Sequence, residues 1–283
     1  MNKDYDSDFE NKWCPGCGNF GILAAMKDAL VSLGIPPRQV LIVSGIGQAA
    51  KTPHFLKCNL LHGLHGRALP LATGAKIANQ DLNIIVNSGD GDCYGEGGNH
   101  FMHAVRRNLD ITLLVHNNKV YGLTQGQASP TSDMGMVTKM QHHGVTTEAF
   151  NPPAVALALG AGFVARGFSG NRKHLNRLIQ AGITHKGLSL IDILQPCVSF
   201  NRVNTFAWYK ERIYDLEAEK HDSGDFKKAL GLAHEWGDRI PIGILYKKEK
   251  PTFMDQIKTL KEKPLIDQTY QPQQLRDLLN PLN

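Results

Sequence analysis

The chain has 283 residues, of which 42% are hydrophobic and 20% are charged, a composition that excludes disorder over most of its length. The length accommodates one large α/β domain or two small ones. Basic residues exceed acidic ones, 31 against 26, and six lysines but only three acids fall between 247 and 263. This local excess predicts a solvated face or a docking surface for an acidic protein. We do not expect nucleic-acid binding, because no helix-turn-helix or RRM signature accompanies the charge.

The sequence also bears on location and on the use of cysteine. No apolar run approaches the roughly 18 residues of a membrane span, and the first twelve residues are polar and acidic, unlike a secretory signal. We therefore expect a cytoplasmic protein with no membrane contact. In that reducing compartment the five cysteines are not expected to form structural disulfides. The glycine content is high: 28 of 283 residues, or about 10%, against a usual ~7%. This excess indicates backbone packed against a ligand such as a phosphate.

Helices and strands alternate in the first 194 residues. In chain order we expect a helix over 19–33, a strand over 40–44, a helix over 67–78, a strand over 83–88, a helix over 95–108, a strand over 111–116, a helix over 152–160, a weak strand over 163–165, a helix over 171–181 and a strand over 188–194. This alternation predicts an α/β fold with a doubly wound, mostly parallel sheet.

The pattern changes near residue 205. Charged helical segments follow, with one apolar strand expected over 240–246 and a polar tail from 264. We expect a ligand-binding domain over 1–205 and a helical or irregular C-terminal extension over 206–283.

Polar and glycine-rich segments follow two of the predicted strands. Gly89-Asp90-Gly91-Asp92 follows one strand, and Asn117-Asn118 ends the next, with Asn118 placed 28 residues after Asp90. Ligands bind beyond the carboxyl ends of parallel strands. An acidic residue does not bind a phosphate directly, but one carboxylate and one amide oxygen hold a divalent cation against a diphosphate. The alternative is an ordinary tight turn with an Asx cap.

This pair of segments resembles the thiamine diphosphate motif, and the resemblance extends along residues 12–205. Trp13-Cys-Pro-Gly-Cys-Gly18, Gly45-Ile-Gly47, Leu64-His-Gly-Arg67, Gly89-Asp-Gly-Asp92 and the segment 117–127 are together similar to the β subunit of 2-oxoacid:ferredoxin oxidoreductases. The resemblance implies a thiamine diphosphate-binding fold with three cofactors, thiamine diphosphate, Mg²⁺ and one [4Fe–4S] cluster.

The resemblance also implies a role for individual residues. The side chains of Asp90 and Asn118 and the carbonyl of Val120 would coordinate Mg²⁺. The cofactor would contact Gly47, His65, Gly89, Gly91, Asp92, Gly122 and Leu123. We assign candidate catalytic roles to His65, as a hydrogen-bond donor to cofactor or substrate, and to Lys51, as a cation for a carboxylate or phosphate. A solvated lysine and a capping histidine are the alternatives.

The cysteines allow several interpretations. Cys14-Pro-Gly-Cys17 has the spacing of a thioredoxin redox pair, but no strand precedes it, and a zinc site lacks a second such pair. An iron–sulfur cluster needs only four thiolates that the fold brings together. The resemblance makes Cys197 a third cluster ligand. Many relatives have a cysteine where Gln48 stands here, and we hypothesise that Cys58 replaces it. Cys93 is the rival and is expected to pack as a small apolar residue.

The resemblance implies oxidative decarboxylation of a 2-oxo acid, such as 2-oxoglutarate or pyruvate, with coenzyme A to acyl-CoA and CO₂, and electron transfer to ferredoxin. It also implies a partner α subunit that supplies the glutamate activating the thiamine, in an α/β heterodimer or a higher oligomer. Glutamine at 125, where some relatives have lysine, leaves the substrate open. The alternatives are a non-redox thiamine diphosphate-dependent lyase and a non-catalytic iron–sulfur or zinc module.

Overall fold

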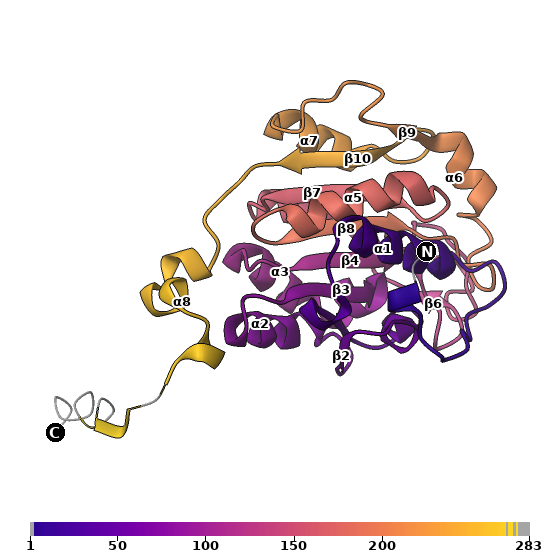
Figure 1. The fold of residues 1–283 in the computed structure, drawn as a ribbon. Helices are drawn as coiled ribbons and strands as arrows, with labels where there is room; N and C mark the ends of the chain where they lie inside the picture. The colour runs from indigo at the N-terminus through magenta and orange to yellow at the C-terminus, as the bar shows by residue number, and fades with distance from the viewer. Residues whose placement is uncertain (1–2, 270, 274–275, 277–283) are drawn as a thin grey trace.

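The computed structural model describes residues 3–269, 271–273 and 276, and its centre is a sheet of eight strands (Figure 1). The strand order is β2-β1-β3-β4-β8-β7-β10-β9, and within it only β10 runs antiparallel to a neighbour, β7. The strands are β1 (Val40–Ser44), β2 (Asn59–His62), β3 (Asn83–Gly89), β4 (Thr112–Asn117), β7 (Phe163–Phe168), β8 (Ser189–Leu194), β9 (Ile213–Asp215) and β10 (Ile240–Lys247). A separate small hairpin pairs β5 (Val120–Tyr121) with β6 (Gln127–Ala128).

Helices cover both faces of the sheet, as the alternating pattern predicted. One layer is formed by α1 (Asn19–Ser32) and α5 (Arg172–Thr184), which pack against each other. The opposite layer contains α2 (Ala68–Ala78), α3 (Gly98–Arg107), α4 (Pro152–Ala158) and α7 (Phe226–His234). The remaining helices are α6 (Phe206–Arg212) and α8 (Lys258–Glu262), and short helical turns are η1 (Lys3–Tyr5), η2 (Pro37–Gln39), η3 (Ala49–Phe55), η4 (Gly91–Glu96), η5 (Met254–Gln256) and η6 (Leu265–Asp267).

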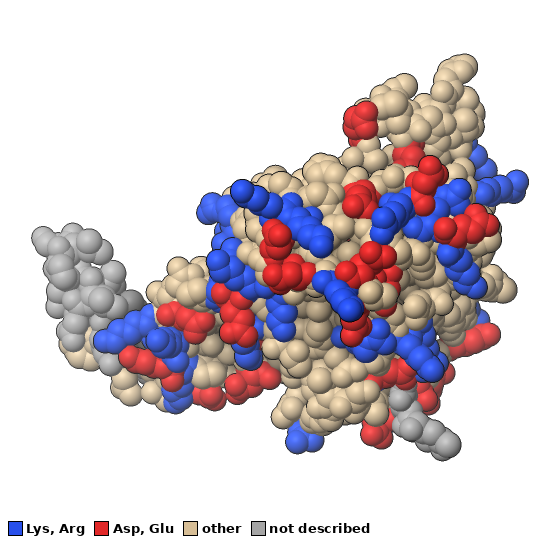
Figure 2. Space-filling view, turned by 90° about the horizontal axis from the view of Figure 1, so that it is seen from above, with Lys and Arg blue, Asp and Glu red and all other residues tan. Residues whose placement is uncertain are grey.

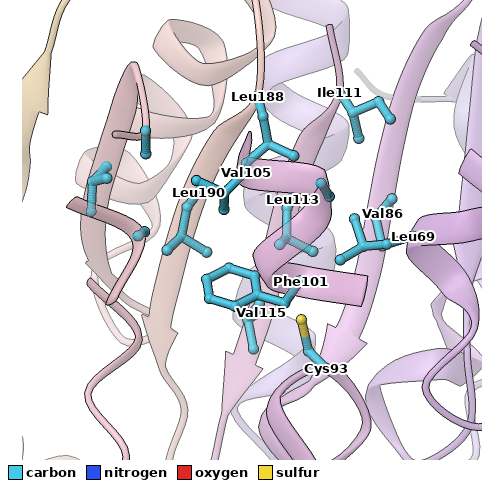
Figure 3. Packing of buried hydrophobic residues seen from close by; sticks show 14 of the residues in the cluster. Leu69, Val86, Cys93, Phe101, Val105, Ile111, Leu113, Val115, Leu188 and Leu190 are labelled. Atoms are coloured by element: carbon cyan, nitrogen blue, oxygen red, sulfur yellow. The ribbon is translucent and has the colours of Figure 1, made fainter. Parts of the chain in front are cut away.

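Two large apolar clusters, one on each face, explain why the central strands are apolar at nearly every position. Successive side chains of a strand point to opposite faces. In β4, Leu113 and Val115 pack with α2 and α3, whereas Leu114 packs with α1 and α5. Figure 3 shows the first cluster, and Cys93 is one of its members, together with Phe101 and Val115. The expectation that Cys93 packs as a small apolar residue is therefore confirmed, since its side chain is buried there.

The segment after residue 205 does not form a separate unit over its whole length. Strands β9 and β10 extend the main sheet, and Leu216, Leu232 and Leu245 belong to the same apolar cluster as the central strands. The chain then passes η5 and α8, where Met254 and Leu260 join the same apolar cluster and Gln80 Nε2 donates to Leu260 O at 2.6 Å. Beyond α8 it extends outward as an arm that carries η6 (Figure 1). Within the described ranges, no helix combines the length and the apolar character that crossing a membrane requires.

On the surface shown in Figure 2, cationic and anionic side chains are interspersed. The arm carries both signs as well. This mixture on the displayed face is typical of a solvated surface.

Candidate active site

A cavity of about 70 Å³ lies at the carboxyl ends of β1, β3 and β4. The chain passes from β1 outward to β2 and then returns to the other side of β1 as β3. Such a reversal of strand order opens a crevice in which α/β proteins bind ligands. All ten residues expected to contact the cofactor line this cavity: Gly47, His65, Gly89, Asp90, Gly91, Asp92, Asn118, Val120, Gly122 and Leu123. Ile46, Gln48, Ala49, Tyr121 and Thr124 also line it and had not been assigned to it.

The glycines of this cavity have two different functions. A Cβ on Gly47 would meet no atom within 4 Å and one on Gly89 would meet only Ala49, at 3.9 Å, so here bare backbone faces open space. That arrangement lets a diphosphate approach backbone amides. Gly91 instead makes room for a ring, because a Cβ there would lie 2.3 Å from Tyr121 Cε1. The chain continues from Gly91 in the π-helical turn η4 rather than in the regular helix expected over 95–108, and α3 begins at Gly98.

The carboxylate of Asp92 accepts hydrogen bonds from the loops that follow β1 and β2 and from the end of β3. Its Oδ1 atom accepts hydrogen bonds from the backbone N–H of Ile46 at 3.0 Å and of Gly66 at 2.7 Å, and Oδ2 accepts one from Ser88 Oγ at 2.5 Å. His65 Nδ1 lies 2.8 Å from Asp92 Oδ1, a close contact without the alignment of a hydrogen bond. Asp92 therefore borders the cavity, but its carboxylate is engaged in positioning the loops.

Asp90 is a buried carboxylate with no ion pair among the described residues. Its Oδ2 atom accepts hydrogen bonds from Ser129 Oγ at 2.5 Å and Thr131 Oγ1 at 2.6 Å. Burial raises the pKa of this carboxyl above its usual value, and the two hydroxyls oppose that rise. A divalent cation would supply the missing positive charge. Sequence reasoning missed Ser129 and Thr131, which are separated from Asp90 by 39 and 41 residues.

The second half of the expected cation site is a tight turn after β4. Lys119 adopts φ +61°, in the left-handed region, and the backbone reverses there. Asn118 Oδ1 accepts a hydrogen bond from the backbone N–H of Val120 at 3.0 Å, so the amide side chain is fixed within the turn. The Lys119 ammonium points away from Asn118 and pairs with Asp133 at 2.7 Å. The turn thus brings Asn118 and Val120 to the cavity beside Asp90.

The two candidate catalytic residues occupy different positions. His65 lines the cavity, and its side chain is 37% exposed. Lys51 lies in η3 and is half-buried, but it does not line the cavity. Its contact with a carboxylate or phosphate stays a prediction.

Two of the four expected cluster cysteines, Cys14 and Cys17, approach the loop that carries the third, Cys197, although among the described residues no three ligating side chains are grouped closely enough to hold a metal ion. Gln195 Nε2 donates to Cys17 Sγ at 3.4 Å, Ser199 Oγ donates to Cys14 Sγ at 3.2 Å, and Cys197 lies between these two donors in sequence. Burial raises the pKa of the Cys17 thiol to about 11, and negative charge on Cys197 and Cys14 contributes to the rise.

Cys58 is not brought to this group. It directly precedes β2, whose first residue, Asn59, pairs with Leu41 near the start of β1. The other cysteines lie at the carboxyl-end edge of the sheet, beyond the last residue of β1. Four residues along β1 separate the position of Cys58 from this carboxyl-end edge, which is about 13 Å at ~3.3 Å per residue. The position of Cys58 therefore does not support its expected role as the fourth ligand.

Comparison with known proteins is consistent with this geometry. The family model "Thiamine pyrophosphate enzyme, C-terminal TPP binding domain" matches residues 42–193, and residues 197–262 match the model for the C-terminal part of the pyruvate ferredoxin oxidoreductase beta subunit. The 2-oxoacid:ferredoxin oxidoreductase subunit beta of Sulfolobus sp is 48% identical over 261 residues, which cover 88% of this chain and 86% of that protein. The 2-oxoglutarate synthase subunit KorB of Methanocaldococcus jannaschii is 36% identical, with 89% and 93% covered.

A solved structure has the same fold. The 2-oxoglutarate:ferredoxin oxidoreductase from Magnetococcus marinus, with 2-oxoglutarate, coenzyme A and succinyl-CoA bound, superposes with a TM-score of 0.92 at 36% identity, over 98% of this chain and 95% of that one. The relatives are ferredoxin oxidoreductase subunits, so neither a non-redox lyase nor a non-catalytic metal module is supported. The chain belongs to the family of 2-oxoacid:ferredoxin oxidoreductase β subunits, which bind thiamine diphosphate.

Proposed function

We propose that this chain, with an α subunit, forms a cytoplasmic enzyme that converts a 2-oxo acid and coenzyme A to acyl-CoA, CO₂, a proton and two electrons, which pass to ferredoxin. When bound, thiamine diphosphate supplies the carbanion chemistry of decarboxylation. The observation that carries the proposal is the cavity itself, which is lined by all ten expected residues, from the segments that follow β1, β2, β3 and β4.

Within this site the chain would hold the diphosphate through a cation. Asp90 and Asn118 supply side-chain oxygens and Val120 a carbonyl, which are ligands suited to Mg²⁺. Ser129 and Thr131 fix the other oxygen of the Asp90 carboxylate, so that Asp90 would keep its orientation as the cation binds. Gly47 and Gly89 leave the backbone open to the diphosphate, and His65 lies at the edge of the cavity, within reach of cofactor or substrate.

The size of the cavity supports a partner subunit. At about 70 Å³ it is well below the roughly 300–1,000 Å³ of sites that enclose a ligand. Among the residues that the structure describes, no glutamate is in its lining, and Glu96 lies at its rim, where its carboxylate accepts a hydrogen bond from the Tyr121 hydroxyl and lies 3.4 Å from His65 Nδ1. Leu64, next to His65, is 75% exposed, and Leu123, in the lining, is 44% exposed. We infer that these apolar side chains are covered by an α subunit, which completes the cavity and supplies the activating glutamate.

For the substrate we propose a 2-oxo acid of the 2-oxoglutarate type. The solved relative binds 2-oxoglutarate and coenzyme A. In this chain residues 120–124 line the cavity, and the next residue, Gln125, has φ +80°, in a region that non-glycine residues rarely occupy. Such backbone strain is concentrated at functional sites. Gln125 is therefore the position at which we expect the choice among 2-oxo acids to be influenced.

The experiment is a reconstitution. The purified chain is assayed for reduction of a viologen dye with thiamine diphosphate, Mg²⁺, coenzyme A and a panel of 2-oxo acids, with and without its α subunit. We expect turnover only in the complex and none in a complex carrying Asp90→Asn. Turnover by the isolated chain would refute the shared site, and full activity of the Asp90→Asn complex would refute the cation site.

A further inference from the structure

Three cysteines and a glutamine stand at the expected cluster positions of this chain. Cys14 and Cys17 approach the loop after β8, where the backbone N–H of Gly18 donates to Pro196 O at 3.3 Å. Cys197 belongs to that same loop. The three thiols are exposed or half-buried, so iron has access to all of them.

Gln48 stands at the position where the resemblance places the missing thiolate. Its carbonyl oxygen accepts a hydrogen bond from Trp13 Nε1 at 2.8 Å, which places the backbone of Gln48 beside the Cys14–Cys17 loop. The side chain turns toward the thiamine cavity, which it lines; its Cγ atom would be 3.7 Å from a Cβ on Gly122. The Oε1 atom is buried without a hydrogen-bond partner.

Resting on the function proposed above, we propose that this chain binds its [4Fe–4S] cluster through Cys14, Cys17 and Cys197 alone. One iron would then have no protein thiolate and would carry an exchangeable ligand such as water, and Gln48 would be the residue that faces this open position. Clusters with four cysteine ligands have no such position.

An iron held only by the cluster sulfides should be lost on oxidation. Ferricyanide removes one electron from [4Fe–4S]²⁺, one Fe²⁺ leaves, and [3Fe–4S]⁺ with three Fe³⁺ remains, so charge and atoms balance. Dithionite and added Fe²⁺ should reverse the change. A fourth thiolate should slow the loss of this iron under the same brief treatment.

The test uses the full chain, purified anaerobically with its α subunit. After ferricyanide treatment, electron paramagnetic resonance should give the signal of [3Fe–4S]⁺, and a chelator should detect about one Fe²⁺ released per chain. Gln48→Cys should suppress both, because it restores a thiolate at the open position. Cys58→Ser should behave as the wild type. Retention of all four irons in the wild type, or loss of the cluster in Cys58→Ser, would overturn the inference.

Calorimetric binding of thiamine diphosphate with Mg²⁺ to the same preparations separates this inference from the proposed function. A complex that binds the cofactor but contains no iron would overturn the three-thiolate site and leave the thiamine site intact. A complex that contains the three-thiolate cluster but does not bind the cofactor would support the three-thiolate site and refute the thiamine site.

Discussion

Gly66 and Gly34 form a matched pair for testing how the cavity loops are held. Both have left-handed backbone, with φ +70° and +65°. A Cβ on Gly34 would meet nothing within 4 Å, whereas one on Gly66 would lie 2.5 Å from the carbonyl carbon of Glu96 and 2.6 Å from the nitrogen of Gly97. Alanine in left-handed backbone costs about 1–2 kcal/mol. Displacing packed backbone adds about 1–3 kcal/mol, so Gly66→Ala should lower the free energy of unfolding by about 2–5 kcal/mol and Gly34→Ala by about 1–2.

Urea denaturation measures both variants, with and without thiamine diphosphate and Mg²⁺. Because the Gly66 N–H donates to Asp92 Oδ1 at 2.7 Å and the neighbouring His65 lines the cavity, Gly66→Ala should also weaken cofactor binding. At a cofactor concentration of 100 times Kd, binding stabilises the folded chain by about 2.7 kcal/mol. Gly34→Ala should keep this gain and Gly66→Ala should lose most of it. If the two variants lose the same stability and are stabilised equally by the cofactor, the close approach of Gly66 to the backbone of Glu96 and Gly97 is refuted.

Three further predictions concern buried charge. Asp90→Asn should abolish Mg²⁺-dependent cofactor binding by calorimetry. Because burial raises the pKa of Asp90, the cofactor-free wild type should lose stability as the pH rises through that pKa, and the variant should lack this loss; an identical pH profile would contradict the argument. Burial lowers the pKa of His116 to about 3, so stability should fall as the pH decreases from about 6.5 toward 3, with a shallower slope in His116→Asn across a series of denaturation midpoints. The Lys119 ammonium lies 4.1 Å from the centre of the Trp236 ring, so Trp236→Ala should lower the free energy of unfolding by about 2 kcal/mol in urea, with partial recovery in Trp236→Phe; no loss would mean that the contact contributes nothing.

The strands that carry the cavity could be predicted because each is a short apolar run buried on both faces. β1 and β3, for example, begin where the pattern places them, at Val40 and Asn83. The motifs at their ends follow directly, since parallel strands bring their carboxyl ends to one edge. Hydrogen-bond partners that come from distant loop residues could not be predicted. Ser129 reaches Asp90 from a long irregular segment that has no periodicity.

Cys58 illustrates the same limit in the opposite direction. It is only ten residues from Gln48 in sequence, but η3 carries the chain across the sheet to the amino-terminal end of β2. The short separation in sequence therefore suggested that Cys58 and Gln48 are close in space, and in the folded chain they are not. Likewise β10 joins β7 in antiparallel register, a non-local pairing that an isolated apolar run at 240–246 does not reveal.

The contact between the Cys14–Cys17 loop and the loop after β8 has a consequence for biosynthesis. After Cys17 the ribosome adds 180 residues to reach and include Cys197, which takes about 9 to 36 s at ~5–20 residues per second. During that interval the N-terminal pair is a bare dithiol, exposed to oxidation and to stray metals, and the loop that completes its surroundings has not been made. Loading of the proposed cluster would then follow closure of the sheet by β8, with the nascent pair kept reduced until that point.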